Sequence, residues 1–223
     1  MLFTAEKLNL IYDQDKETQT YAVKNIDLTI ERSKFIGILG PSGSGKSSLL
    51  YLLSGLKLPT SGSVSYKEQD LAELTDQERA NLRKQEFGFV FQEHFLIEYL
   101  PVLDNVLAPV NEDSPEWKAR ARELLQRLGI EDLAEKKPHE LAGGQRQKVA
   151  IARALINKPE VLFADELTAN LDHDNAWMIM DLLTEYLEEA TLIVVTHDPT
   201  ILQNADKIIK LWDGQIKTEA DQS

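Results

Sequence analysis

The chain has 223 residues, of which 43% are apolar, and it carries a formal net charge of −13. This length and composition fit a large globular domain, and the acidic balance argues against a general nucleic-acid-binding protein, which needs a basic surface. The chain contains no cysteine, which excludes disulfides and thiolate metal sites. Its apolar stretches are too short to span a membrane, so we expect any membrane-spanning part to belong to another chain.

The N-terminal part predicts two paired strands followed by a nucleotide-binding loop. Residues 3–12 and 21–30 alternate apolar and polar side chains as strands do, with a polar hairpin loop between them. Residues 35–39 are an apolar strand-like run, and residues 48–53 have the composition of a helix. Between them lies Gly-Pro-Ser-Gly-Ser-Gly-Lys-Ser, which matches the phosphate-loop pattern G-x-x-x-x-G-K-[ST] at every fixed position. The strand-loop-helix context is the one that this motif requires.

The residue types in this loop suit a nucleoside triphosphate. Its glycines let backbone N–H groups converge on one anion, at the positive end of the following helix. Lys46 is placed to reach the terminal phosphates, and the Ser47 hydroxyl is placed to bind Mg²⁺. The nucleotide-binding residues expected here are Gly40, Pro41, Ser42, Gly43, Ser44, Gly45, Lys46, Ser47 and Ser48.

The middle of the chain changes from a mixed pattern to a helical one. Residues 63–66 resume a strand, and the capping-box spacing of Thr75 and Glu78 predicts the start of a helix. Residues 87–91 read as a buried strand. From 93 to 138 the periodicity is helical, which predicts a helical subdomain inserted into an α/β core.

The α/β pattern returns in the last third of the chain. We expect helices across 146–157 and about 174–188, strands at 161–164 and 191–195, and a hairpin turn at Asp213-Gly214. Alternation of this kind predicts a parallel sheet covered on both faces.

Two adjacent carboxylates, Asp165 and Glu166, end the strand predicted at 161–164. Ligands of open α/β sheets bind at this carboxyl edge. The first acid suits Mg²⁺, and the second suits orienting and polarising the water that attacks the γ-phosphate. A solvated acidic turn is the alternative for the pair alone, but the phosphate loop earlier in the chain favours the catalytic interpretation.

A second candidate phosphate contact lies at residues 141–145, which read Leu-Ala-Gly-Gly-Gln before the helix predicted from Arg146. Two glycines at a helix start expose backbone N–H groups to an anion. Taken alone, this segment is more typical of an ordinary loop.

The order of these motifs resembles the nucleotide-binding subunit of an ATP-binding cassette (ABC) transporter over nearly the whole chain. The family pattern continues after the phosphate loop with a glutamine loop, a signature L-S-G-G-Q, an acidic strand end, an aspartate loop and a switch histidine. These occur here as Gln92, residues 141–145, Asp165-Glu166, Asn170-Leu171-Asp172 and His197.

The resemblance implies an α/β fold, a P-loop NTPase of the ABC ATPase type. Its mixed sheet core would carry an antiparallel β subdomain and an inserted helical subdomain. It implies one domain over 1–223, in which 1–92 and 146–223 form the core with the β subdomain. Residues from about 93 to 145 would form the helical subdomain, with the signature.

The resemblance also implies the cofactors ATP and Mg²⁺ and a role for each motif. The implied metal ligands are Ser47, Gln92 and Asp165, and the implied catalytic residues are Glu166 as general base, His197 at the γ-phosphate, and Gln92. Tyr12 would stack on adenine, although an aromatic residue that ends a strand is also typical of a core. In a homodimer that buries two ATP between two chains, further contacts would come from Ala142, Gly143, Gly144, Gln145 and Asp172.

Two positions depart from the family pattern. Ala142 replaces the signature serine, which removes a hydroxyl contact to the γ-phosphate worth about 1.5–3 kcal/mol. Leu167 replaces the proline that usually follows the glutamate, which frees the backbone of the turn that carries Glu166. Neither change removes an acid, base or phosphate donor, so we expect the chain to be active.

Within the family, the chain resembles the branch of lipoprotein release and of macrolide, peptide and haem efflux. This implies a membrane permease partner with an extracytoplasmic domain and a peripheral location on the cytoplasmic side of the cell membrane. Residues 95–103 would form part of the groove for the permease, or instead the core of the helical subdomain. A regulator that signals through a membrane partner without transport would share the same ATPase, so the sequence leaves both functions open.

Other functions fit less well. Small-molecule kinases and GTPases also use a phosphate loop, but Asn157-Lys158-Pro159-Glu160 ends in the wrong acid for guanine recognition and precedes the acidic strand. A DNA-repair ATPase of the same superfamily would need a long coiled coil between its nucleotide motifs. His94, His139 and His173 have no partner at metal-binding spacing, so we expect surface or structural roles for them.

Overall fold

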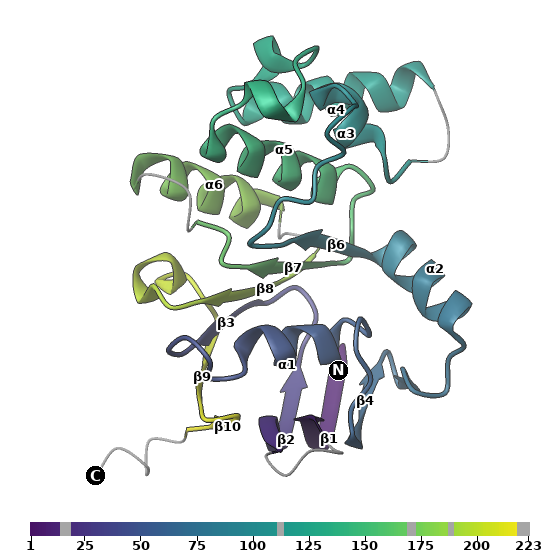
Figure 1. Ribbon diagram of the computed structural model, residues 1–223, viewed down its shortest axis with the longest axis vertical. Coiled ribbons are helices and arrows are strands. Elements are labelled where there is room, and N and C mark those ends of the chain that lie inside the picture. The colour runs from purple at the N-terminus through teal and green to yellow at the C-terminus, as the bar shows by residue number, and fades with distance from the viewer. Residues whose placement is uncertain (14–18, 111–113, 169–172, 187–189, 218–223) are drawn as a thin grey trace.

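The computed structural model describes residues 1–13, 19–110, 114–168, 173–186 and 190–217, which form two sheets and a group of helices (Figure 1). The smaller sheet is antiparallel, with the strand order β2-β1-β4-β5. Its strands are β1 (Phe3–Tyr12), β2 (Thr20–Ile30), β4 (Ser61–Tyr66) and β5 (Gln69–Asp70). The antiparallel pairing predicted for the first two alternating segments is confirmed, while most of the loop predicted between them lies outside the described residues.

The larger sheet has six strands in the order β10-β9-β3-β8-β7-β6. Neighbouring strands from β9 to β6 pair in parallel, and only β10 is antiparallel to its neighbour. The strands are β3 (Phe35–Leu39), β6 (Phe87–Val90), β7 (Val161–Asp165), β8 (Thr191–Thr196), β9 (Lys207–Trp212) and β10 (Gln215–Ile216). This confirms the parallel sheet and the C-terminal hairpin expected from the sequence.

Helices cover this sheet, and a helical group lies above it in Figure 1. The α-helices are α1 (Lys46–Leu53), α2 (Asp76–Glu86), α3 (Val102–Leu107), α4 (Pro115–Arg127), α5 (Gly143–Leu155) and α6 (His173–Tyr186), with short 3-10 turns at Glu131–Leu133, Pro138–Glu140 and Pro199–Leu202. Helix α5 begins at Gly143, so the start predicted at 146 was wrong. The glycines form its first turn, where their N–H groups need no partner inside the helix.

Each face of the parallel sheet has its own core, as alternating side chains require. On β7, Leu162 and Ala164 pack with the helical group, whereas Val161 and Phe163 pack with α1 and the antiparallel sheet. The run predicted as one apolar strand is thus buried on both sides. Residues 95–103 include both core and exposed side chains. Val102 and Leu103 are buried in the helical core, whereas Phe95 and Tyr99 are 67% and 75% exposed.

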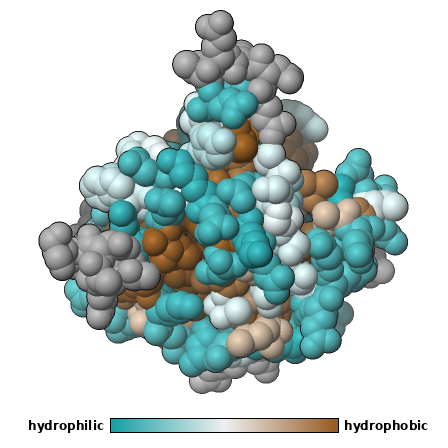
Figure 2. All heavy atoms as spheres, turned by 90° about the horizontal axis from the view of Figure 1, so that it is seen from below, coloured by the Kyte–Doolittle hydropathy of each residue, from teal (hydrophilic) through white to brown (hydrophobic). Residues whose placement is uncertain are grey.

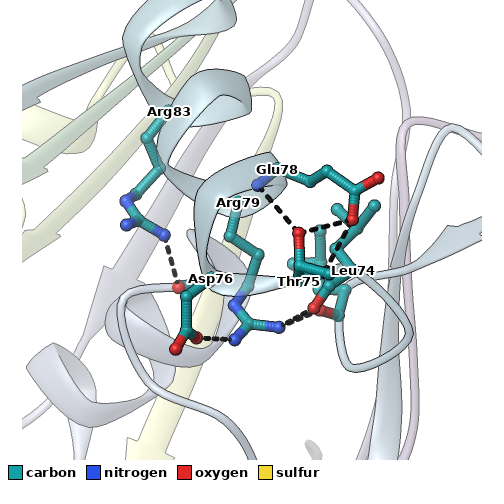
Figure 3. A network of polar contacts seen from close by, with 8 residues as sticks. Leu74, Thr75, Asp76, Glu78, Arg79 and Arg83 are labelled. Atoms are coloured by element: carbon teal, nitrogen blue, oxygen red, sulfur yellow. Dashed lines mark hydrogen bonds and ion pairs between the residues drawn. The ribbon is translucent and has the colours of Figure 1, made fainter.

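Arg79 anchors α2, the helix that leads into β6 (Figure 3). Its guanidinium donates hydrogen bonds to the carbonyl oxygens of Leu71 and Leu74 and pairs with Asp76. Arg79 is only 8% exposed, whereas the Asp76 side chain is 99% exposed. The helix start itself has the predicted capping box, because Thr75 and Glu78 bond each other's backbone N–H groups. The hydrogen bonds to the buried carbonyl oxygens should therefore dominate the energy of this network.

We expect Arg79→Met to lower the free energy of unfolding by about 2–4 kcal/mol, because it leaves two carbonyl oxygens without their donor. Asp76→Asn should change stability little, since the ion pair that it weakens is solvated. Arg122→Met is the control, because Arg122 pairs with Glu135 at an exposed position. Urea unfolding measures all three variants. Equal losses for Arg79→Met and Asp76→Asn would show that the ion pair carries the energy instead.

Candidate nucleotide site

The phosphate loop connects β3 to α1, and its glycines are required by close approach of the backbone. Gly43 and Gly45 have positive φ angles of 79° and 96°, a region that other residues adopt only with strain. A Cβ atom at Gly45 would lie 2.0 Å from the carbonyl oxygen of Ala22, and one at Gly40 would lie 2.2 Å from that of Leu211. The loop is therefore pressed between β2 and β9, and only glycine fits at these positions.

Lys46 is the first residue of α1 and is only 7% exposed. Its Nζ donates to the carbonyl oxygen of Pro41 at 2.9 Å, within the loop itself. The helix N-terminus adds the partial positive charge of its free N–H groups. A buried ammonium group and a helix N-terminus directed at one loop make a site for an anion.

Asp165 ends β7 and is 4% exposed, and its Oδ1 atom has no hydrogen-bond partner among the described residues. Burial raises the pKa of Asp165, and the charge of Glu166 adds to this effect. A hydrogen bond with Ser47 and the charge of Lys46 act in the opposite direction. An unpaired buried carboxylate oxygen beside a serine hydroxyl suits a small divalent cation, because Mg²⁺ prefers oxygen ligands.

Glu166 and His197 meet where β7 and β8 end. The Nδ1 atom of His197 lies 2.9 Å and 3.0 Å from the two carboxylate oxygens of Glu166. Glu166 has a φ angle of +52°, and its N–H donates to the carbonyl oxygen of Val195 at 2.9 Å. Its side chain is 15% exposed and that of His197 is 67% exposed. The carboxylate is thus held by an imidazole that remains open to solvent.

A pocket of about 710 Å³ brings most of the predicted residues together. The predicted residues that line it are Tyr12, Pro41, Ser42, Gly43, Gly45, Lys46, Ser47, Ser48, Gln92, Glu166 and His197. Gly40, Ser44 and Asp165 do not line this pocket: Ser44 and Asp165 are buried, and Gly40 lines a neighbouring cavity with Leu39 and Pro41. Asp172 and the rest of the predicted aspartate loop fall outside the described residues. The pocket can therefore hold a phosphate chain beside a carboxylate, an amide and an imidazole.

Tyr12 lies in this pocket at the end of β1. Its hydroxyl is 3.4 Å from the Ser48 hydroxyl, and Nζ of Lys57 lies 3.8 Å from the ring centroid. A cation on one face of the ring holds the ring in place, and Lys57 is not part of the pocket wall. Tyr12 thus lies in the pocket with one ring face against Lys57, an arrangement that suits contact with a flat ligand.

The predicted signature residues 142–145 do not line this pocket. Ala142 is the N-cap of α5 and offers no side-chain cap, and its N–H donates to Oε1 of Gln145 at 3.0 Å. A Cβ atom at Gly143 would meet nothing within 4 Å. The signature is thus a helix start, exposed at Ala142 and Gly143, whose first-turn N–H groups need no partner inside the helix, and it does not line the pocket of its own chain.

Sequence reasoning missed three pocket residues on β2, namely Thr20, Tyr21 and Ala22. Their pattern is that of an ordinary strand, and only the close contact between Ala22 and Gly45 brings them to the loop.

No helix among the described residues is long and apolar enough to span a membrane.

Comparison with known proteins agrees with this geometry. The ABC transporter family matches residues 23–169. An uncharacterized ABC transporter ATP-binding protein of Methanocaldococcus jannaschii, MJ1508, is 45% identical over 204 residues, which cover 90% of this chain and 91% of that protein. The macrolide export ATP-binding/permease protein MacB of Mannheimia succiniciproducens is 40% identical over 215 residues, which cover 95% of this chain but 33% of that longer protein.

Among solved structures, the chain resembles the ATP-binding cassette MJ0796, in a dimeric post-hydrolysis state bound to ADP and Pi. The TM-score is 0.92 at 38% identity, and the match covers 97% of each chain. A second dimeric structure of MJ0796, described as a bacterial ABC transporter cassette, gives the same values. The predicted α/β fold with its antiparallel sheet and helical part is confirmed. The chain belongs to the ABC transporter family, as an ATP-binding ATPase with the fold of the ABC cassette.

Proposed function

We propose that this chain is the ATPase subunit of a membrane exporter, and that it powers a permease for a hydrophobic or amphipathic substrate. The observation that carries the ATPase part is the pocket that joins the phosphate loop to Gln92, Glu166 and His197. The export part is supported by the similarity to a macrolide export ATP-binding/permease protein. The division into a core and an inserted helical subdomain from about 93 to 145 stays part of this proposal.

In the proposed mechanism, Lys46 and the loop N–H groups bind the β- and γ-phosphates, and Tyr12 receives the adenine ring. Glu166 accepts a proton from the attacking water, and His197 holds the carboxylate in place from the open side of the pocket. Ser47, Asp165 and Gln92 would hold Mg²⁺, which neutralises phosphate charge when bound. The unpaired Oδ1 of Asp165 supports this ligand set, because no donor in the described part of the chain competes for it.

The exposed signature supports a homodimer in which each chain completes the other's site. The start of α5 has no side-chain cap for its first-turn N–H groups, and residues 142–145 do not line the pocket of their own chain. Two solved structures of the similar cassette MJ0796 are described as dimeric. We infer that residues 142–145, with Asp172, contact the nucleotide held by a second copy.

We expect Glu166→Gln to lower kcat for ATP at least about 100-fold, because the amide cannot accept a proton. The same variant should form a stable dimer with ATP, since it binds the nucleotide without turning it over. Light scattering with and without ATP measures the dimer, and phosphate release measures turnover. Glu123→Gln on the exposed side of α4 is the matched control and should resemble the wild type. A Glu166→Gln protein that stays monomeric with ATP would contradict the two-chain site.

We expect Ala142→Ser to leave ATPase activity unchanged or raise it. The new hydroxyl supplies an N-cap that α5 lacks, worth about 1 kcal/mol, and a further donor toward the partner's nucleotide. Steady-state phosphate release and thermal unfolding measure both effects. Ala119→Ser, in the exposed middle of α4, provides the control, because serine there gains no capping role. A clear fall in turnover for Ala142→Ser alone would show that the alanine has its own function.

The surface around the segment that contains Gln92 is the proposed contact with the permease. A groove of about 440 Å³ is lined by Phe89, Phe91 and Phe95, and Tyr99 is exposed on the same segment as Phe95. Exposed aromatic side chains of this kind are typical of protein interfaces. We infer that the subunit binds its permease here, on the cytoplasmic side of the membrane. An extracytoplasmic domain on that permease is part of the proposal.

We expect Phe95→Ser combined with Tyr99→Ser to abolish co-purification with the permease and the stimulation of ATPase activity by it, because the aromatic anchors are lost. The membrane protein encoded beside this gene is the partner to test. The matched control is Trp212→Ser, which removes a 54% exposed aromatic residue from β9. Apolar surface also lies among hydrophilic side chains on the face seen from below (Figure 2). Trp212→Ser therefore tests whether the loss of any exposed aromatic residue has the same effect. Equal loss in both proteins would argue against a specific contact.

A further inference from the structure

Two buried polar atoms that belong neither to the phosphate loop nor to the Asp165-Glu166 pair have no hydrogen-bond partner among the described residues. They are Nε2 of His94 and Oε1 of Gln147. Gln147 lies on α5 and is 1% exposed, and His94 is partly buried and follows Gln92 by two residues. An unpaired buried polar atom loses its hydration without replacement, so native proteins avoid leaving one. One of these atoms can donate a hydrogen bond, and the other can only accept one.

The two side chains act on one another. Burial lowers the pKa of His94, and the Gln147 side chain opposes this by raising it. A neutral imidazole carries one N–H, and a hydrogen on Nε2 would give Gln147 the donor that its carbonyl oxygen lacks. The present geometry does not close this hydrogen bond, and closing it would satisfy both atoms at once.

The backbone around His94 is already fixed to the same helix. The Arg153 guanidinium, also on α5, donates to the carbonyl oxygens of His94 at 2.7 Å and of Phe95 at 2.6 Å. Phe95 has a φ angle of +45°, an unusual backbone conformation that these hydrogen bonds hold in place. The backbone that bears the His94 imidazole is therefore hydrogen-bonded to α5.

The amide nitrogen of Gln147 contacts the turn that carries Glu166. Its Nε2 donates to the carbonyl oxygen of Leu167 at 2.9 Å. Leu167 follows Glu166, whose positive φ needs restraint from its surroundings. Leu167 stands where the family pattern has a proline, so the backbone here lacks the fixed φ angle that proline would give. The hydrogen bond from Gln147 restrains the turn instead.

We propose that His94 and Gln147 are a pair of positioning residues that tie the segment after Gln92 to the turn that carries Glu166. Gln92 follows β6 and Glu166 follows the neighbouring strand β7, and both line one pocket. In the proposed pairing, Gln147 bonds both His94, two residues after Gln92, and Leu167, directly after Glu166. The Gln147 side chain thereby sets the position of the Gln92 amide relative to the Glu166 carboxylate around the γ-phosphate. The proposal rests on the catalytic role proposed for Glu166.

The pairing is tested first without catalysis, by ¹⁵N NMR of selectively labelled histidine in the full chain. We expect a hydrogen-bonded Nε2–H for His94 in the protein with Mg²⁺ and the non-hydrolysable analogue AMPPNP, and its loss in Gln147→Leu. Gln126→Leu, at an exposed position on α4, is the matched control and should leave the His94 signal unchanged. A His94 signal that ignores Gln147→Leu overturns the pairing.

The kinetic test uses His94→Phe, which keeps the ring and removes the donor, and His94→Gln, which keeps a donor of similar reach. We expect His94→Phe to lower kcat about tenfold with KM for ATP and the unfolding midpoint unchanged, and His94→Gln to recover most of the rate. Gln147→Leu should be slow as well, and the double variant His94→Phe with Gln147→Leu should be no slower than Gln147→Leu alone. Wild-type kcat in His94→Phe, no rescue by His94→Gln, or additive losses would each overturn the proposal.

These outcomes are distinct from a failure of the proposed function. If Glu166→Gln hydrolyses ATP at the wild-type rate, Glu166 is not the base, and the NMR result still decides whether His94 pairs with Gln147. If Glu166→Gln is inactive and the histidine variants are normal, the base is correct and the positioning pair is wrong.

Discussion

Parallel pairing of β3 with β8, and of β8 with β7, places three strand ends at one edge of the sheet. Leu39 lies opposite Thr196, and Asp165 lies opposite Val195. The phosphate loop, the Asp165-Glu166 pair and His197 therefore leave the sheet side by side, although long stretches of sequence separate them. A shift of one residue in the register of β7 would move Asp165 to the other face of the sheet and separate it from Ser47. The chemistry of the site depends on this register.

The antiparallel sheet supports the phosphate loop from behind. Ala22 on β2 closes against Gly45, and the Gly214 N–H donates to the carbonyl oxygen of Ser44 at 3.0 Å. The Lys24 N–H in turn donates to the carbonyl oxygen of Gly214 at 2.7 Å. The loop is thus held by β2 on one side and by the turn between β9 and β10 on the other. Its N–H groups are oriented before a phosphate arrives, which lowers the ordering cost of binding.

Features that depend on local sequence could be predicted, and features that depend on long-range contacts could not. The glycines of the phosphate loop and the cap formed by Thr75 and Glu78 are encoded within a few residues, and the structure has both. The part played by β2 in the pocket was missed, because only tertiary packing brings Ala22 to Gly45. His94 was expected to have a surface or structural role, since its sequence neighbours give no sign of Gln147, which is buried on a helix far along the chain. Helix α5 was predicted to start late, because glycine propensity is a poor guide in a first turn.

Helix α5 connects two parts of the site that the sequence treats separately. Its first residue, Gly143, is exposed and belongs to the segment proposed to meet a second copy of the chain. One helical turn further on, Gln147 bonds the carbonyl oxygen that follows Glu166 of its own chain. In the proposed homodimer, a displacement of the start of this helix would reach the turn that carries the proposed base through the Gln147 side chain. In a homodimer of the proposed kind, each chain would sense at its own Glu166 that its signature has engaged the partner's nucleotide. Because Ala142 has no hydroxyl for that contact, the backbone N–H groups at the start of α5 have to make more of it.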